Sequence, residues 1–438
     1  MVIFSGHAPA RNYPTNPHDF RAGSTYLYFG GPPLENAALL IEPSSDGSAG
    51  STLYRPPTST DSALWMGASP DDAELAFAAG LPAGGLADPD QLASALGDRR
   101  AAAVIPPFPD TIDWASKLGV EAASEDELRV LVDLRLIKDE YELAAMRRSN
   151  AVAIEAHRAA AAATGPGRGE ADAAAAFMQV IHRRQCGVSF SPIISVRGEV
   201  LHGHGHPNVM STGNLLVCDA GAEEPGGYAS DITRTYPVDG RWTPIQRLLY
   251  DTVEKALKTA IAACTPGTRF RDVHDLSARV ICEGLIEAEL LKGDPAELAG
   301  RRAHALFFPH GVGHLIGLDV HDMEDFGEIA GYPPGRKRRP DFGDKFLRLD
   351  RDLAPGVCTT IEPGIYFVPA IWASEALVQP LADVVNRSKV DALLTDGFGG
   401  IRIEQSIRVR AGDADGPEVL SAALPTGADE AAAMVGGD

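Results

Sequence analysis

The stretch PHGVGHLIGLDVHD, residues 309–322, places His310, His314 and His321 within fourteen residues. A neutral imidazole can bind a metal, transfer a proton or donate a hydrogen bond to developing charge. A helical pair in the H-E-x-x-H pattern would suit a zinc protease. However, a proline and two glycines disfavour a helix here, and no glutamate follows the first histidine. We therefore expect a strand or an extended loop, in which His310 and His314 point the same way.

Four carboxylates stand in or at the ends of strand-like runs elsewhere in the chain. GNLLVCDAG contains Asp219, and twelve residues later YASDITRTYPV contains Asp231. The intervening EEPGG is typical of a turn, so a hairpin can bring the two aspartates together. VCTTIEPGIYF carries Glu362, and the alternation of GGIRIEQSIRVR puts Arg402 and Glu404 on one face and two isoleucines on the other.

Each of these residues, taken alone, also fits a structural role. Asp219 could be a strand-end cap, and Arg402 with Glu404 could form a buried salt bridge. One histidine together with four carboxylates, however, is an oxygen-rich ligand set that suits Mn²⁺, Co²⁺ or a similar divalent ion. Four carboxylates in one pocket would need about four compensating positive charges to stay ionised, which two divalent cations supply.

Composition excludes several classes of protein. The chain has 438 residues, 45% of them hydrophobic, which suffices for two or three domains. With a net charge of −21 and a pI of about 5.0, neither nucleic acid nor an anionic membrane is an expected partner. No run approaches the length of a transmembrane helix, and the first residues lack the pattern of a secretory signal. Five scattered cysteines indicate reduced thiols, so a cytoplasmic protein is expected.

Residues 1–134 alternate strand-like and helix-like segments, which predicts a small α/β domain. STYLYFGG (24–31), AALLIEP (37–43) and AAAVIPP (101–107) are expected to be strands. SPDDAELAFAAG (69–80) and DPDQLASALG (88–97) are expected to be helical.

From residue 135 onward the chain is predicted to form a second, α+β domain. Helices are expected at 138–163, 170–184, 244–263 and 272–291, and strands at 214–219, 228–238, 357–362 and 400–410. Hairpin spacing between the strands favours antiparallel pairing over a parallel sheet. The basic stretch 331–345 is expected to be a solvated loop, and the tail after about residue 412 to be loosely ordered.

In these motifs the sequence resembles the metal-dependent Xaa-Pro peptidases, the pita-bread family of prolidases and aminopeptidases P. The likeness runs from residue 138 to about 410, through DAGAEEPGGYASDITRTYPVDG, PHGVGHLIGLDVHD, TIEPGIYF and GIRIEQS. The two aspartates are one residue farther apart than is usual in the family. STYLYFGG and LWMG resemble the family's smaller N-terminal domain more loosely. The resemblance implies a creatinase/prolidase-like domain at 1–134 and a pita-bread catalytic domain at 135–438.

The resemblance also implies a dinuclear centre. Its two divalent ions are expected to be Mn²⁺, with Co²⁺ or Zn²⁺ as alternatives, and its implied ligands are Asp219, Asp231, His314, Glu362 and Glu404. His310, His321 and His202 would line the pocket and hydrogen-bond the substrate. The neighbouring His204 and His206 leave the alignment of His202 ambiguous.

By the same resemblance, the reaction is hydrolysis of an Xaa-Pro bond in small peptides by a homodimeric enzyme. Glu362 would accept a proton from the attacking water and pass it to the proline nitrogen, and Arg402 would orient Glu404. A dipeptidase is favoured because a long link of 42 residues separates Glu362 from Glu404 and because Arg348 could hold a dipeptide's carboxylate. The alternatives are an aminopeptidase P acting on longer peptides, a metal-free or organophosphate-cleaving relative, and a non-catalytic binding module.

Overall fold

The computed structural model describes residues 1–13, 15–43, 49–68, 70–82, 84–203, 205–412 and 416–436. The chain divides into two compact units, Met1–Leu131 and Val132–Asp438, and the division falls within helix α6 (Glu125–Leu136). Within the described residues no helix is both long enough and apolar enough to cross a membrane.

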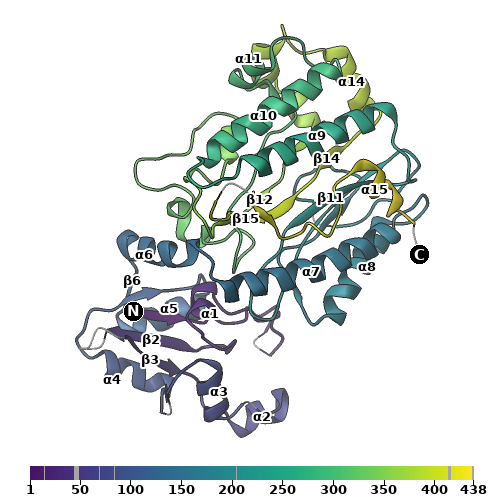
Figure 1. Cartoon of the computed structure of the whole chain (residues 1–438). Coiled ribbons are helices and arrows are strands. Elements are labelled where there is room, and N and C mark those ends of the chain that lie inside the picture. Colours follow the sequence, from purple (N-terminus) through teal and green to yellow (C-terminus); the bar gives the residue numbers. More distant parts are fainter. Residues whose placement is uncertain are drawn as a thin grey trace. The chain divides into compact units, whose positions relative to one another are not determined.

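The first unit is built on a six-stranded mixed sheet with the order β4-β3-β2-β1-β5-β6 (Figure 1). Its strands are β1 (Val2–Phe4), β2 (Ala38–Pro43), β3 (Ala49–Tyr54), β4 (Leu86–Ala87), β5 (Ala102–Val104) and β6 (Glu121–Ala122). Its helices before α6 are α1 (Ser24–Tyr28), α2 (Thr60–Met66), α3 (Asp72–Ala78), α4 (Leu92–Leu96) and α5 (Pro109–Leu118). The strands predicted at 37–43 and 101–107 are confirmed as β2 and β5, and the helical segments as α3 and α4.

The strand predicted at 24–31 is wrong, because Ser24–Tyr28 forms the short helix α1. A run of alternating aromatic residues this short does not distinguish a helical turn from a strand. Tertiary packing favours the helix at this segment. The Tyr26 ring lies so close to Gly31 that a Cβ atom on Gly31 would stand 2.3 Å from the ring. Tyr26 is thereby buried with Ile3 and Leu39 in the core of the first unit.

The second unit contains the predicted helices, with some shifts of their ends. They are α7 (Glu140–Ala162), α8 (Glu170–Arg183), α9 (Pro244–Ala263) and α10 (Phe270–Glu287), followed by the short α11 (Pro295–Gly300), α12 (Pro369–Trp372), α13 (Glu375–Val378), α14 (Arg387–Thr395) and α15 (Ala428–Ala433). α7 and α8 lie on one side of the strands and α9 and α10 on the other (Figure 1). The α10 helix begins two residues before and ends four residues before its predicted bounds.

All the strand pairs described in the second unit are antiparallel, which confirms the predicted α+β character. The strands are β7 (Gly187–Val188), β8 (Ile193–Ser195), β9 (Leu215–Ala220), β10 (Ala222–Glu223), β11 (Ile232–Pro237), β12 (Cys358–Ile361), β13 (Gly364–Tyr366), β14 (Gly400–Arg402), β15 (Gln405–Arg408) and β16 (Glu418–Val419). β9 pairs with β11 so that Thr233 stands opposite Asp219, as the hairpin prediction requires.

The run 400–410 is two strands rather than the predicted one. β14 pairs with β13, whereas β15 pairs with β12, so the chain changes partner between Arg402 and Gln405. Glu404 stands in this break and is buried. At the break, Glu404 donates its backbone N–H to the carbonyl of Thr233 at 3.0 Å, which places it beside β11.

The histidine stretch forms an extended loop beside β12, as predicted. Thr360 donates its backbone N–H to the carbonyl of His314 at 2.9 Å, and Glu362 donates to Val312 at 2.8 Å. Gly313 lies so close to β12 that a Cβ atom would stand 2.0 Å from the Thr360 carbonyl oxygen. The glycine is therefore required for the loop to lie against the strand.

The prediction of a loosely ordered tail is wrong for the part of the tail that the structure describes; residues 413–415 and 437–438 lie outside it. β16 pairs with β15, and Leu424 is fully buried in the core of the second unit. The buried Arg234 guanidinium donates to the carbonyls of Leu424 and Pro425 at 2.6 and 2.8 Å. These tail carbonyls accept hydrogen bonds that the buried Arg234 cation needs. The described part of the tail is therefore part of the fold.

Candidate metal centre and active site

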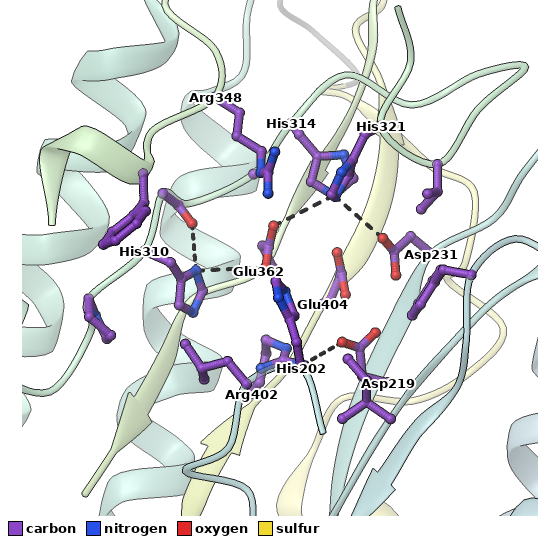
Figure 2. A pocket seen from close by; sticks show the side chains of 18 of the residues that line it. His202, Asp219, Asp231, His310, His314, His321, Arg348, Glu362, Arg402 and Glu404 are labelled. Atoms are coloured by element: carbon purple, nitrogen blue, oxygen red, sulfur yellow. Dashed lines mark hydrogen bonds and ion pairs between the residues drawn. The ribbon is translucent and has the colours of Figure 1, made fainter. Parts of the chain in front are cut away.

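A cavity of about 530 Å³ opens among the strand ends of the second unit (Figure 2). Its described lining includes all ten residues predicted for the site: His202, Asp219, Asp231, His310, His314, His321, Arg348, Glu362, Arg402 and Glu404. Apolar side chains such as Phe190, Ile193 and Phe346 complete the wall. β9, β11, the histidine loop and the ends of β12 and β14 thus deliver acidic, basic and apolar groups to one place.

The centre of the cavity can hold a metal ion. One donor atom from each of Asp231, His314 and Glu404 lies within 4.8 Å of the other two, and all three residues are buried. His314 Nε2 stands 3.4 Å from Asp231 Oδ2 and 3.7 Å from Glu362 Oε1. One carboxylate oxygen of each of Asp219, Asp231 and Glu404 is buried without a hydrogen-bond partner among the residues that the structure describes. Buried carboxylate oxygens of this kind, next to an imidazole, are suitable ligands for a divalent cation.

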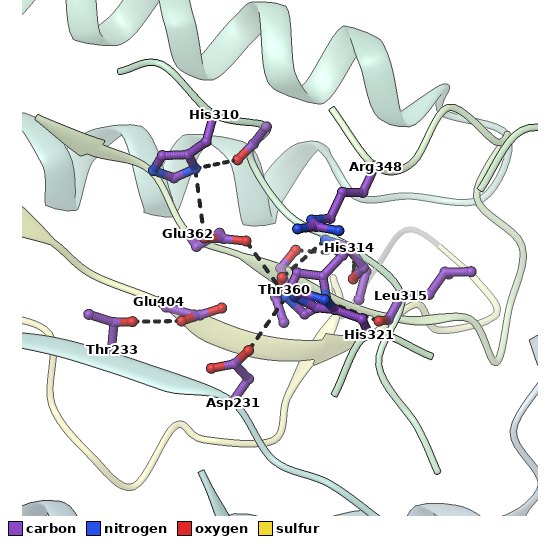
Figure 3. Close-up of polar contacts among 12 residues, drawn as sticks. Asp231, Thr233, His310, His314, Leu315, His321, Arg348, Thr360, Glu362 and Glu404 are labelled. Atoms are coloured by element: carbon purple, nitrogen blue, oxygen red, sulfur yellow. Dashed lines mark hydrogen bonds and ion pairs between the residues drawn. The ribbon is translucent and has the colours of Figure 1, made fainter. Parts of the chain in front are cut away.

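The orientation of His314 suits a ligand. Its Nδ1 lies 3.0 Å from the backbone carbonyl of Leu315, which can only accept, so Nδ1 carries the proton. Nε2 therefore presents its lone pair to the carboxylates (Figure 3). A hydrogen bond that fixes the tautomer of a metal-binding imidazole is a common feature of metal sites.

Two residues that sequence reasoning did not single out contact the site: Thr233 binds a carboxylate directly, and Tyr366 binds Arg402. Thr233 Oγ1 donates to Glu404 Oε2 at 2.7 Å, and Arg402 Nε donates to Thr233 Oγ1 at 3.2 Å. The Arg402 guanidinium forms an ion pair with Asp219 and also donates to the Tyr366 hydroxyl at 2.9 Å. Arg402 was expected to orient Glu404; its direct carboxylate partner is Asp219, and its link to Glu404 passes through Thr233. Thr233 and Tyr366 belong to the quoted motifs, but only their neighbours across strands reveal their contacts.

Burial makes the acidic groups difficult to ionise without a cation. Burial and the charges of Asp219 and Glu362 raise the pKa of Asp231 well above its usual range. Burial and Asp231 do the same to the pKa of Glu404, and burial with Glu404 raises the pKa of Glu362 to about 8. Arg402 supplies one positive charge, which several carboxylates share. The donor set thus fits a group that brings more positive charge.

The other two histidines of the loop stay neutral. Burial and Arg402 lower the pKa of His310 to about 3, and burial and His314 lower that of His321 to about 2. His310 Nδ1 is 2.8 Å from the Gly311 carbonyl, and Nε2 is 2.9 Å from the Tyr366 hydroxyl, so both ring nitrogens have protein partners. The His321 ring packs against His314 at 4.3 Å between centroids, and its side chain is 36% exposed.

The positions of His202 and His206 help to decide which histidine of this segment lines the pocket. His202 lines the cavity, whereas His206 is hydrogen-bonded through Nδ1 to the Ile194 carbonyl at 3.0 Å. His206 does not appear among the described lining residues, and His204 lies outside the described part of the chain. His202 therefore stays the candidate.

Two arginines stand along one wall of the cavity. Arg348 lines it and forms an ion pair with Glu324 at 2.5 Å. Arg338 also lines it, although the basic stretch 331–345 was expected to be solvated, and its Nε is 2.8 Å from Glu328. Both arginines border a smaller adjoining cavity of about 200 Å³. This wall offers guanidinium groups to an anionic part of a ligand.

Comparison with known families decides the class of the protein. The model of metallopeptidase family M24 matches residues 144–411, which include every residue of the centre just described. The chain belongs to this metallopeptidase family. A second model, of the aminopeptidase P N-terminal domain, matches residues 1–96.

Relatives and solved structures resemble the metallopeptidase over 70% to 99% of its length. It is 30% identical to Xaa-Pro aminopeptidase 1 of Streptomyces coelicolor, over 98% of this chain and 82% of that protein. It is 34% identical to the Xaa-Pro dipeptidase of Homo sapiens, over 70% of this chain and 62% of that protein. The proline aminopeptidase P II of Yersinia pestis superimposes with a TM-score of 0.79 at 25% identity, covering 99% of this chain and 94% of that one. These comparisons confirm the expected pita-bread domain and the smaller domain before it.

The three histidines of the loop should differ when each is replaced with alanine. His314→Ala is expected to lose bound metal, because its Nε2 is the lone pair that faces the carboxylates. His310→Ala and His321→Ala should keep the metal and lose turnover, because both residues line the cavity but neither belongs to the cluster of metal donors. Metal content of the three purified variants, measured by mass spectrometry, tests the assignment. Equal metal loss in all three would show that it is wrong.

Proposed function

We propose that the protein is a metal-dependent Xaa-Pro aminopeptidase, which removes the residue that precedes a proline at the N-terminus of a peptide. The observation that carries this proposal is the cluster of one histidine and four carboxylates that opens into a cavity of about 530 Å³. Likeness to Xaa-Pro aminopeptidase 1 along nearly the whole chain, and the match of the N-terminal domain, support the substrate class. The complete acidic set favours an enzyme over a non-catalytic binding module.

The dipeptidase expected from the sequence is the second candidate. It is favoured by Arg348, which lines the cavity and could bind the carboxylate that follows proline in a dipeptide. The human Xaa-Pro dipeptidase is also 34% identical over 70% of the chain. The comparisons support the aminopeptidase better, because its relatives match both domains.

We assign five residues to two divalent ions, with Mn²⁺ first and Co²⁺ or Zn²⁺ as alternatives: Asp219, Asp231, His314, Glu362 and Glu404. Bound divalent ions lower the pKa of water and polarise a peptide carbonyl. Asp219 is held by Arg402, and Glu404 by Thr233, so both carboxylates are oriented before any ion binds. Preorganised ligands reduce the cost of assembling the site.

The remaining polar groups of the cavity are proposed to transfer a proton or to hydrogen-bond the peptide substrate. The two oxygens of Glu362 lie 3.7 Å from His314 and 3.7 Å from His310, which suits a group that accepts a proton from water and passes it to the proline nitrogen. His321, neutral and partly exposed, is placed to donate a hydrogen bond to the substrate. His310 would have to exchange one of its present partners to do the same. A proline nitrogen in a peptide has no hydrogen, so peptidases that need this donor do not cleave the bond.

Substrate length separates the two candidates. With Mn²⁺ present, the wild-type protein should hydrolyse the tripeptide Ala-Pro-Ala with a higher kcat/KM than the dipeptide Ala-Pro, and chelation of the metal should abolish both activities. Release of alanine, followed by chromatography, measures the two rates. Cleavage of the dipeptide alone would replace the aminopeptidase by the dipeptidase, and cleavage of neither would refute the proposal.

Arg348→Ala shows what the arginine does. If its guanidinium binds a carboxylate that follows proline, the variant should raise KM for Ala-Pro by about ten- to a hundred-fold, equivalent to about 1.5–3 kcal/mol for a lost charge-assisted bond. KM for Ala-Pro-Ala should change little. Arg301→Ala, which removes an arginine paired with Asp383 outside the described lining of the cavity, is the matched control. An unchanged KM for the dipeptide would exclude this role.

A further inference from the structure

Three charged residues that the proposed chemistry does not use form a buried cluster at the end of the histidine loop. The side chains of Arg135, Lys138 and Asp322 are 2%, 1% and 1% exposed. Asp322 Oδ1 accepts from Arg135 Nη2 at 2.7 Å, and Oδ2 accepts from Lys138 Nζ at 2.7 Å. The desolvation of buried charges offsets much of their attraction, so stability alone is a weak reason for such a cluster.

The cluster is linked to the metal-facing imidazole through one carbonyl group. The backbone N–H of Asp322 donates to the Leu315 carbonyl at 3.0 Å. The same carbonyl accepts from His314 Nδ1 at 3.0 Å, the bond that fixes the tautomer of His314 (Figure 3). Asp322 also directly follows His321, whose ring packs on His314. Fixing Asp322 therefore fixes both imidazoles.

The groups that bind the Asp322 carboxylate are tightly packed. The backbone N–H of Lys138 donates to the Gly356 carbonyl at 3.0 Å, and its Nζ donates to the Arg135 carbonyl at 2.8 Å. A Cβ atom at Gly317 would stand 2.6 Å from Asp322 Oδ2 and 2.7 Å from Lys138 Cε, so the packing around the ion pair is tight. The carboxylate is thus held by two buried cations, and one of them, the Lys138 ammonium, is itself hydrogen-bonded to a backbone carbonyl.

We propose that Asp322 is a positioning residue, which with Arg135 and Lys138 locks the histidine loop in the geometry that presents His314 Nε2 to the acidic cluster. The inference rests on the proposed metal centre. It predicts that the charge of Asp322, a residue outside the cluster of metal donors, controls metal affinity and the tautomer of His314.

The test compares Asp322→Asn with Asp350→Asn. Asp350 is a matched control because it is fully buried and accepts hydrogen bonds from two arginines, Arg269 at 2.6 Å and Arg271 at 3.1 Å. Calorimetric titration with Mn²⁺ should show about ten- to a hundred-fold weaker binding by Asp322→Asn, the usual effect of losing a residue that orients a ligand. Asp350→Asn should bind Mn²⁺ like the wild type. Nitrogen NMR of the metal-free protein should show a single His314 tautomer in the wild type and a mixture in Asp322→Asn.

A second variant covers the case in which Asp322→Asn does not fold. Lys138→Met keeps Asp322 paired with Arg135, and it should weaken Mn²⁺ binding less than Asp322→Asn does but more than Asp350→Asn. Wild-type Mn²⁺ affinity and an unchanged His314 tautomer in the folded variants would overturn the proposal, whatever their melting temperatures. Mn²⁺ affinity and the His314 tautomer are both measured without a peptide. A failure of the proposed peptidase activity would instead be seen in assays of the wild-type protein, so the two failures can be distinguished.

Discussion

Repulsion among buried carboxylates is the constraint on which the second unit depends. Asp219, Asp231 and Glu404 are buried, and Glu362 stands beside them with a pKa raised to about 8. Like charges in a site with little water repel strongly unless cations stand among them. Arg402 forms an ion pair with Asp219 and brings a single positive charge, so most of the required positive charge has to come from bound ions.

The strand pairing keeps these mutually repelling groups together. β9 and β11 fix the two aspartates, and the change of partner between β14 and β15 places Glu404 beside them. Arg234, buried behind the centre, donates to the backbone carbonyl of Glu404 at 2.7 Å and to Leu424 at 2.6 Å. The histidine loop is held against β12 on one side and by the Arg135–Lys138–Asp322 cluster on the other. The fold thus supplies the energy that holds an electrostatically unfavourable cluster ready for metal.

Much of this centre could be predicted from the sequence, because its residues stand in local patterns. The alternation around Arg402 and Glu404 indicates extended backbone, as do the prolines and glycines near the histidines and Glu362. The change of strand partner between Arg402 and Gln405 does not follow from this local pattern. The roles of Thr233, Tyr366 and Asp322 could not be predicted, because each depends on a partner far away in the sequence. The same reason explains the errors at α1 and in the tail, where tertiary packing overrides a weak local signal.

The most direct measurement is a crystal structure of the protein grown with Mn²⁺, with anomalous-scattering maps that locate the ions. We expect two anomalous peaks in the cavity, both within coordination distance of the set formed by Asp219, Asp231, His314, Glu362 and Glu404. We also expect Arg402, Thr233 and Asp322 to keep their present contacts. A cavity without an anomalous peak, or ions bound by other side chains, would show that the proposed metal centre is wrong.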